Sequence, residues 1–261
     1  MYDGIRFGGT IEIDDAWKLG IDHIAIATGA GKPTIVKIKN NLIRGIRKAS
    51  DFLMGLQLTG AAKKDSLANL MLQLPAVVIG GGLTAIDTTT EAFAHYPIQV
   101  EKFLDRYEGS VAEFGEEKVM SMYDEEEKGI AKTFLEHGAA IRAERKRAAE
   151  AGEEPNFVPL VRSWGGVTLC YRKTVNDSPA YRLNHEEVIK SLEEGIYYWE
   201  KMSPVEAIPN EYGAVKEMIF RKQGKTNEGK YIELDDTITL PAKTVIVAAG
   251  TSPNVIYERE H

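Results

Sequence analysis

Short apolar runs that end near glycine alternate with longer helix-like stretches along this chain. An apolar, β-rich run bounded by turn residues predicts a buried strand, whereas apolar residues spaced three and four apart predict a helix. This alternation is typical of an α/β protein with parallel strands. Strands are expected at residues 22–28, 76–80, 166–173, 196–199 and 244–249.

The segments between these strands carry helical patterns. Asn184 and Glu187 have the spacing of a capping box and are expected to open a helix that Gly195 ends. Earlier helices are expected at residues 49–56, 63–74 and 83–94, and three strand-like pieces at 215–221, 231–234 and 237–240 predict an antiparallel β-meander. The expected fold is a three-layer α/β domain with a β-meander crossover.

One charged segment interrupts this rhythm, from about residue 98 to residue 163. Between Glu101 and Glu154 there are fifteen acidic and nine basic residues, a local net charge of 15 − 9 = 6 negative charges out of the −7 of the whole chain. We interpret it as an inserted helical segment. It is either a solvated hairpin with i, i+4 pairs, such as Asp124 with Lys128 and Lys132 with Glu136, or a docking surface. Its many apolar side chains favour docking to another domain, to a subunit or to a second copy of the chain: Phe103, Tyr107, Phe114, Met120, Met122, Tyr123 and Phe134.

The composition excludes several classes of protein. The 261 residues suggest one large or two modest domains, and the net charge of −7 argues against nucleic acid as a partner. The single cysteine, Cys170, excludes a disulfide scaffold and is expected to be a buried strand thiol. No apolar run approaches the roughly 18 residues of a membrane helix, and no secretory signal is visible, so a cytoplasmic protein is expected. Histidine and acidic residues show no metal-site spacing, and no catalytic residue is assigned.

The junction of the strand at 76–80 with the following helix carries the clearest chemistry. Gly80, Gly82 and Ala85 fit the pattern G-x-G-x-x-G/A directly after a strand and at the start of a helix. In that pattern the first glycine allows a tight turn, and the second lets a pyrophosphate approach the backbone. The small third residue lets helix and strand pack closely. The free amides and dipole of the helix start then favour the diphosphate of a dinucleotide.

Two interpretations of the next strand lead to different nucleotides. If residues 98–101 form the second strand, Glu101 lies where an acidic residue binds the ribose hydroxyls of NAD. If the strand at 166–173 is the second one, that position carries Arg172 and Lys173, whose cationic groups suit the 2′-phosphate of NADP. The second interpretation, which requires the charged segment to be an insertion, is favoured by a resemblance.

The chain resembles the NADPH-binding portion of the glutamate synthase small subunit and its relatives, which include the N-terminal part of dihydropyrimidine dehydrogenase. These proteins are FAD- and NAD(P)-dependent oxidoreductases of the pyridine nucleotide-disulfide oxidoreductase superfamily. The matching stretches cover most of the chain outside the charged segment: residues 22–30, 41–45 with 49 and 52–53, 77–87, 167–173, 179–180, 194–196 and 245–254.

The resemblance implies an FAD/NAD(P)-binding Rossmann-like domain that holds NADP(H) and passes a hydride to FAD. It places Gly80, Gly81, Gly82, Leu83, Thr84 and Ala85 at the pyrophosphate, and Arg172 with Lys173 at the 2′-phosphate. Crossovers near the flavin would be formed by Thr28, Gly29, Gly250 and Thr251. The implied layout is an end of the FAD-domain half at 1–35, linker helices at 36–74, the NAD(P)-binding domain at 75–250, and a return to the FAD domain at 251–261.

The chain departs from the family in three respects. Leu83 stands where the family usually has Asn, and the insertion of about 65 residues is not part of its pattern. A separate FAD fingerprint is also missing, since only about 20 residues precede Ile24. We therefore expect the chain to work with an FAD-binding domain, and with further redox domains or subunits, and to retain no FAD and have little reductase activity alone; stoichiometric flavin after purification would contradict this. Alternatives are an NADH-specific version and a non-catalytic nucleotide-binding scaffold that works through its insertion.

Overall fold

The computed structural model describes residues 2–27 and 29–253, which fall into two compact units. The larger unit is Pro33–Gly250, and the smaller one is formed by residues on both sides of it. The smaller unit contains α1 (Ile13–Lys18), and β1 (Lys32–Pro33) pairs with β10 (Thr251–Ser252) in a two-stranded sheet. The strand expected at 22–28 is wrong over residues 22–27, because no described segment offers these residues a hydrogen-bonding partner.

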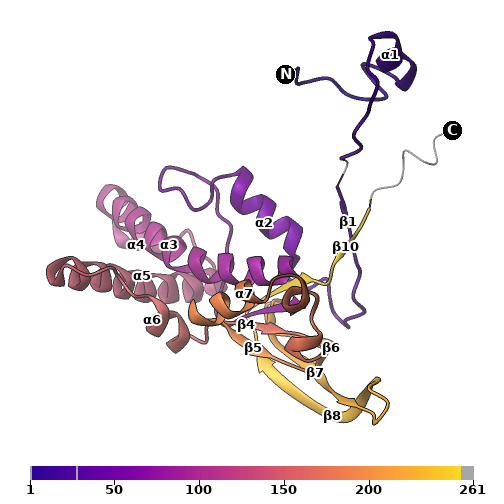
Figure 1. Ribbon diagram of the computed structural model, residues 1–261. Coiled ribbons are helices and arrows are strands. Elements are labelled where there is room, and N and C mark those ends of the chain that lie inside the picture. Colours follow the sequence, from indigo (N-terminus) through magenta and orange to yellow (C-terminus); the bar gives the residue numbers. More distant parts are fainter. Residues whose placement is uncertain (1, 28, 254–261) are drawn as a thin grey trace. The chain divides into compact units, whose positions relative to one another are not determined.

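A five-stranded parallel sheet lies at the centre of the larger unit (Figure 1). Its order is β2 (Ile46–Lys48), β9 (Thr244–Ala248), β3 (Ala76–Gly80), β4 (Val167–Cys170) and β5 (Tyr197–Trp199). Every residue of β3 is buried, as expected for a parallel strand that is covered on both faces. The α/β fold class is confirmed, and β3 pairs with β4 on one side and with β9 on the other.

The helix after β3 is far longer than the sequence pattern suggests. It was expected at residues 83–94, but α3 (Leu83–Phe114) continues for 32 residues and contains Pro97. Proline removes one backbone donor from a helix interior, yet its burial together with Tyr96 and Val100 stabilises this stretch. Residues 98–101 are therefore helical, and the alternative in which they form the second strand is wrong.

The charged segment folds as helices that pack on the domain. After α3 come α4 (Glu116–Met120), α5 (Glu125–Ala151) and α6 (Val158–Ser163), and α3 lies beside α5 (Figure 1). The ion pairs mostly differ from those expected: Lys128 pairs with Glu125, while Asp124 caps α5 by accepting from the Glu127 amide. Phe134 is buried, whereas Phe114 and Met122 are exposed.

Segments around this core also differ from the expectations. The helix expected at residues 63–74 is wrong: residues 63–65 form a turn and residues 66–73 are irregular. The Gln99 amide bonds both the N–H and the carbonyl of Leu72, at 2.7 and 2.8 Å. α2 (Ala49–Leu58) is confirmed. α7 (Pro179–Glu193) begins before Asn184, capped by Ser178, and Asn184 breaks its geometry with φ −155° and ψ 82°. No helix among the described residues is long and apolar enough to cross a membrane.

A three-stranded antiparallel meander forms the third layer. Its strands are β6 (Met202–Pro209), β7 (Val215–Lys225) and β8 (Tyr231–Pro241), in that order. The meander was expected, but two of the predicted pieces are parts of β8, and β6 was missed because Pro204 and Pro209 obscure its strand pattern.

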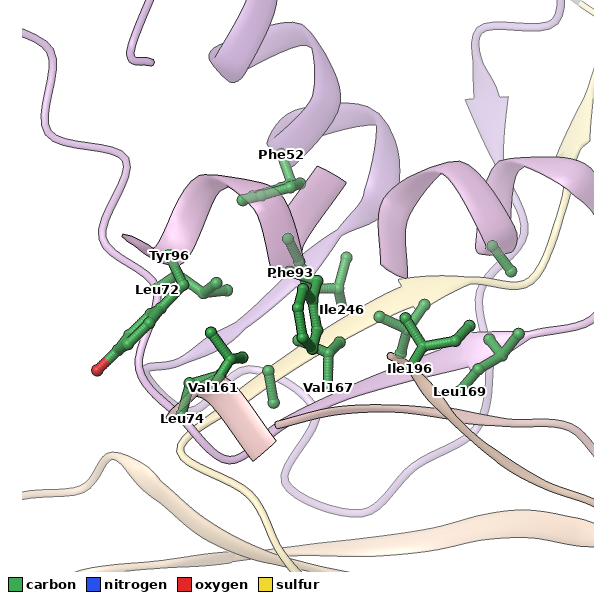
Figure 2. Close-up of a cluster of buried hydrophobic side chains, with 14 of the residues drawn as sticks. Phe52, Leu72, Leu74, Phe93, Tyr96, Val161, Val167, Leu169, Ile196 and Ile246 are labelled. Carbon is green, nitrogen blue, oxygen red and sulfur yellow. The ribbon is translucent and has the colours of Figure 1, made fainter. Parts of the chain in front are cut away.

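Two apolar cores separate the three layers. Val78 of β3 contributes to the core beneath the helices, whereas Val77 and Ile79 contribute to the core beneath the meander. This alternation follows from the two-residue period of a strand. The helical core contains side chains from helices, strands and connecting segments (Figure 2): Phe52, Leu72, Phe93, Tyr96, Val161, Leu169 and Ile246. The meander core contains Met218, Phe220 and Val245.

Candidate functional site

The turn between β3 and α3 is built by glycines with different surroundings. A Cβ on Gly80 would lie 2.3 Å from the Ala248 carbonyl oxygen and 2.9 Å from the Ala85 Cβ. Ala85 itself is completely buried. The first glycine and the small third residue of the predicted pattern therefore let the strand, the turn and the helix pack closely.

Gly82 is different because a Cβ there would have no atom within 4 Å. It is the N-cap of α3, with φ −94° and ψ 173°, and no side chain among the described residues caps the helix at this position. The first-turn amides of a long helix, together with its dipole, form a favourable position for an anion. Gly82 thus leaves open space where a phosphate group would need it.

Gly81 is required by a neighbour that sequence reasoning did not single out. A Cβ on Gly81 would lie 2.2 Å from the ring of Tyr171, which directly follows β4. The Tyr171 N–H donates to Trp199, the Tyr171 carbonyl accepts from Met202, and the Ala180 N–H donates to the Gly81 carbonyl at 3.0 Å. These hydrogen bonds hold the backbone of Tyr171 and of the glycine turn. The aromatic residue before Arg172 was the sequence signal that could have indicated the contact between Gly81 and the Tyr171 ring.

These residues line a cleft of about 550 Å³ at the carboxyl ends of the central strands. In open α/β sheets this edge is where ligands bind. One wall is the glycine turn, and the others are the ends of β4 and β9. Two segments that sequence reasoning missed complete it: residues 34–36 and residues 202–204.

The structure brings half of the twelve predicted site residues to this cleft. Its lining includes Gly80, Gly81, Gly82, Thr84, Arg172 and Gly250. Ala85 lies beneath the turn, and Leu83 packs against the helical core. Gly29 and Thr251 belong to the smaller unit, and Thr28 lies outside the described residues.

The cationic residues after β4 differ in their surroundings. Arg172 is exposed at the cleft, and among the described residues no ion pair to it is found. Lys173 does not line the cleft; its ammonium lies 5.7 Å from the centre of the Tyr231 ring. Glu101, by contrast, lies on α3 and pairs with Arg145 at 2.9 Å, so it is not at the end of a strand.

Two titratable groups of the cleft remain protonated at neutral pH. Burial raises the pKa of the Cys170 thiol, which is fully buried as the sequence predicts. Burial also raises the pKa of the Tyr171 phenol, and the nearby Arg172 and Arg182 act in the opposite direction. The cleft therefore offers hydrogen-bonding and cationic groups, and neither Cys170 nor Tyr171 supplies an anion to it.

Comparisons with known proteins give one relative in sequence. No protein-family model matches the chain. The uncharacterized protein RP006 of Rickettsia prowazekii (strain Madrid E) is 36% identical over 268 residues, which cover 98% of this chain and 35% of that protein. The chain thus spans about a third of the length of this curated relative.

Several solved structures are similar in part. FprA from Mycobacterium tuberculosis has 12% sequence identity and a TM-score of 0.47, over 86% of this chain and 49% of that chain. A structure of FprA in complex with NADPH has 12% identity and a TM-score of 0.45 over the same shares. An FAD-dependent pyridine nucleotide-disulphide oxidoreductase from Desulfovibrio vulgaris has 14% identity and a TM-score of 0.41, over 90% and 37%.

Proposed function

We propose that this chain binds NADPH in the cleft and presents it to FAD within a larger oxidoreductase of the glutamate synthase small subunit type. The observation that carries the proposal is the glycine turn at the start of α3. Gly80 and Ala85 are packed, while Gly82 alone in the fingerprint opens onto free space beside the helix amides. This is the division of roles that a pyrophosphate site requires.

The choice of NADPH over NADH rests on the residue at the end of β4. Because β4 pairs directly with β3, the residue after Tyr171 would occupy the position that contacts the ribose of the adenosine half. Arg172 stands there and lines the cleft. A guanidinium can bind a phosphate monoester with two hydrogen bonds, whereas the NADH alternative would need a carboxylate at this position.

The chain's own residues would bind and orient the nucleotide. Gly82 and Thr84 would lie along the pyrophosphate, and Gly250 with residues 34–36 would border the other end of the cleft. FAD, when bound by a partner domain, supplies the electron acceptor for the hydride. The protein would supply positioning and electrostatics.

Calorimetric titration of the chain with NADPH and NADH tests this function. We expect wild type to prefer NADPH. The Arg172→Ala variant should lose roughly 10- to 100-fold in NADPH affinity, since a hydrogen bond to a charged group contributes about 1.5–3 kcal/mol, with NADH affinity unchanged.

Arg147→Ala is the matched control, because Arg147 lies on α5 and pairs with Glu144 and Glu153 away from the cleft lining. It should leave both affinities unchanged. A wild-type chain that binds NADH as tightly as NADPH, with no effect of Arg172→Ala, would overturn the assignment.

A further inference from the structure

The Asp177 carboxylate has several partners in and around the loop that follows Arg172 and Lys173. Asp177 accepts hydrogen bonds from the Tyr231 hydroxyl at 2.5 Å, from the Lys225 ammonium at 3.0 Å and from the Thr174 hydroxyl at 3.0 Å. These hydrogen bonds, that of Tyr231 foremost, lower the pKa of Asp177, so it is ionised at neutral pH. Arg182 also pairs with it at 3.3 Å.

Two of these partners come from a distant part of the chain. Lys225 ends β7 and Tyr231 begins β8, and the turn between them brings both to the loop after β4 (Figure 1). The Tyr231 ring also contacts cations, with the ammonium groups of Lys173 and Lys225 at 5.7 and 5.1 Å from its centre. The Thr174 N–H donates to the Tyr231 hydroxyl at 3.1 Å, so the tyrosine holds the loop by both its ring and its hydroxyl.

The side chains around Asp177, namely Thr174, Arg182, Lys225 and Tyr231, adjoin the cleft through Tyr171. This phenol lines the cleft, and the charged or polar groups that act on its pKa are Arg172, Arg182, Tyr231 and Asp177. Four cations therefore gather around the end of β4: Arg172, Lys173, Arg182 and Lys225. The acidic groups bound to the same loop are Asp177 and Glu200, and the Glu200 carboxylate accepts from the Val175 N–H. In a chain with a net charge of −7, this local excess of positive charge is opposite to the whole.

We infer that Lys225 and Tyr231 are specificity-determining residues for the 2′-phosphate of the nucleotide, an inference that rests on the proposed function. Lys225 would supply a second cationic group at the loop that follows Arg172, where the Asp177 carboxylate holds it at 3.0 Å. Tyr231 is a positioning residue that fixes the loop and both lysines. The β7–β8 hairpin thus forms a wall of the phosphate site that the glycine fingerprint alone does not indicate.

The test compares adenosine 2′,5′-bisphosphate with 5′-AMP, two probes that differ only in the 2′-phosphate. Lys225→Gln should weaken binding of the bisphosphate about tenfold, and Tyr231→Phe several-fold, while the affinity for 5′-AMP stays unchanged. Lys225→Arg should restore most of the affinity. Lys222→Gln is the matched control, since Lys222 lies on the same strand and pairs with Asp236 instead.

The outcomes separate this inference from the proposed function. If Arg172→Ala weakens binding of the bisphosphate but Lys225→Gln and Tyr231→Phe do not, the hairpin has no role and the proposed function stands. If Lys225→Gln weakens both probes equally, Lys225 acts on folding and the inference is wrong. If wild type does not distinguish the probes and Arg172→Ala has no effect, the proposed NADPH site fails and the inference fails with it.

Discussion

At the residue scale, the three glycines of the β3–α3 turn serve packing and ligand access separately. Gly80 and Gly81 would bring a Cβ within 2.3 Å of a backbone oxygen and 2.2 Å of the Tyr171 ring, whereas Gly82 has free space around it. All three positions carry the same residue type, glycine. Their surroundings decide which glycine is structural and which leaves access to a ligand.

This difference predicts opposite behaviour of two alanine variants. Gly80→Ala should lower the free energy of unfolding by about 1–3 kcal/mol, because the methyl group overlaps the Ala248 backbone. Gly82→Ala should change it by less than about 0.5 kcal/mol, since nothing is displaced and its φ suits alanine. Urea denaturation of both variants measures this difference.

Nucleotide affinity should follow the opposite order. Gly82→Ala is expected to weaken NADPH binding at least about tenfold, because its methyl group takes the space left for the pyrophosphate. A Gly82→Ala variant of full stability and full NADPH affinity would show that no phosphate approaches this backbone.

At the element scale, α3 and α5 approach closely because of one small residue. A Cβ on Gly138 would lie 2.6 Å from the Val100 carbonyl oxygen and 3.0 Å from the Leu104 Cβ. Ion pairs then join the two helices, with Arg142 bonded to Asp105 and Glu108. The contact between the helices depends on a glycine in the middle of α5 that helix propensity alone disfavours.

Alanine substitution at two glycines of α5 should therefore change the free energy of unfolding in opposite directions. Gly138→Ala should lower the free energy of unfolding by about 1–3 kcal/mol through overpacking against α3. Gly129→Ala should raise it by about 0.5–1 kcal/mol, because Gly129 is exposed and has no neighbour within 4 Å. Thermal or urea unfolding of the two variants measures these changes in the free energy of unfolding. Changes of equal size and the same sign would contradict the close contact of α3 with α5 at Gly138.

At the scale of the whole molecule, the charged segment shares a core with the sheet. Phe134, Ile141 and Val161 belong to the same buried cluster as Val78 of β3 and Leu169 of β4. Removing the segment would therefore expose the helical face of the sheet to solvent. Of the apolar residues singled out in the sequence, Phe134 belongs to this core and Phe103 packs against it, whereas Phe114 and Met122 are exposed.

This shared core also contains a titratable pair that should make the protein sensitive to acid. The Tyr96 hydroxyl lies 2.6 Å from Nδ1 of His137, whose ring stacks on Trp164 at 3.7 Å. Burial lowers the pKa of His137 to about 4 from its ordinary 6.5. The unfolded chain therefore binds a proton more readily, and stability is lost as the pH falls from about 6.5 to about 4.

Urea denaturation between pH 7 and pH 4 should show this loss, and His137→Gln should reduce it while keeping an acceptor for Tyr96. His95 acts in the same direction, because burial lowers its pKa too, so the variant should not abolish the effect. Ion-paired carboxylates titrate lower, as with Glu144, whose pKa Arg147 lowers to about 2. An unchanged pH dependence in His137→Gln would show that His137 is already solvated in the native state.

The features that depend on local pattern could be predicted from the amino-acid sequence. The strand, glycine turn and helix at residues 76–87, the α/β rhythm and the cations after β4 follow from near-neighbour chemistry, and the structure places the glycine turn and Arg172 on one cleft. Prediction from the sequence failed where contacts with distant residues determine the local conformation. Residues 22–27 have no strand partner among the described segments, and α3 continues through Pro97 because burial compensates the lost hydrogen bond. The backbone of Leu72 is bonded to the Gln99 side chain of α3 and not to a helix of its own.

Contacts between residues that are distant in the sequence became known from the tertiary structure alone. It paired β4 with β3, which removed Glu101 as a ribose ligand, and it brought Lys225 and Tyr231 to Asp177 across 48 and 54 positions of sequence. Short-range pattern reports the conformation that each segment prefers. Contacts between distant segments depend on how those segments pack together, and that packing is a property of the whole chain.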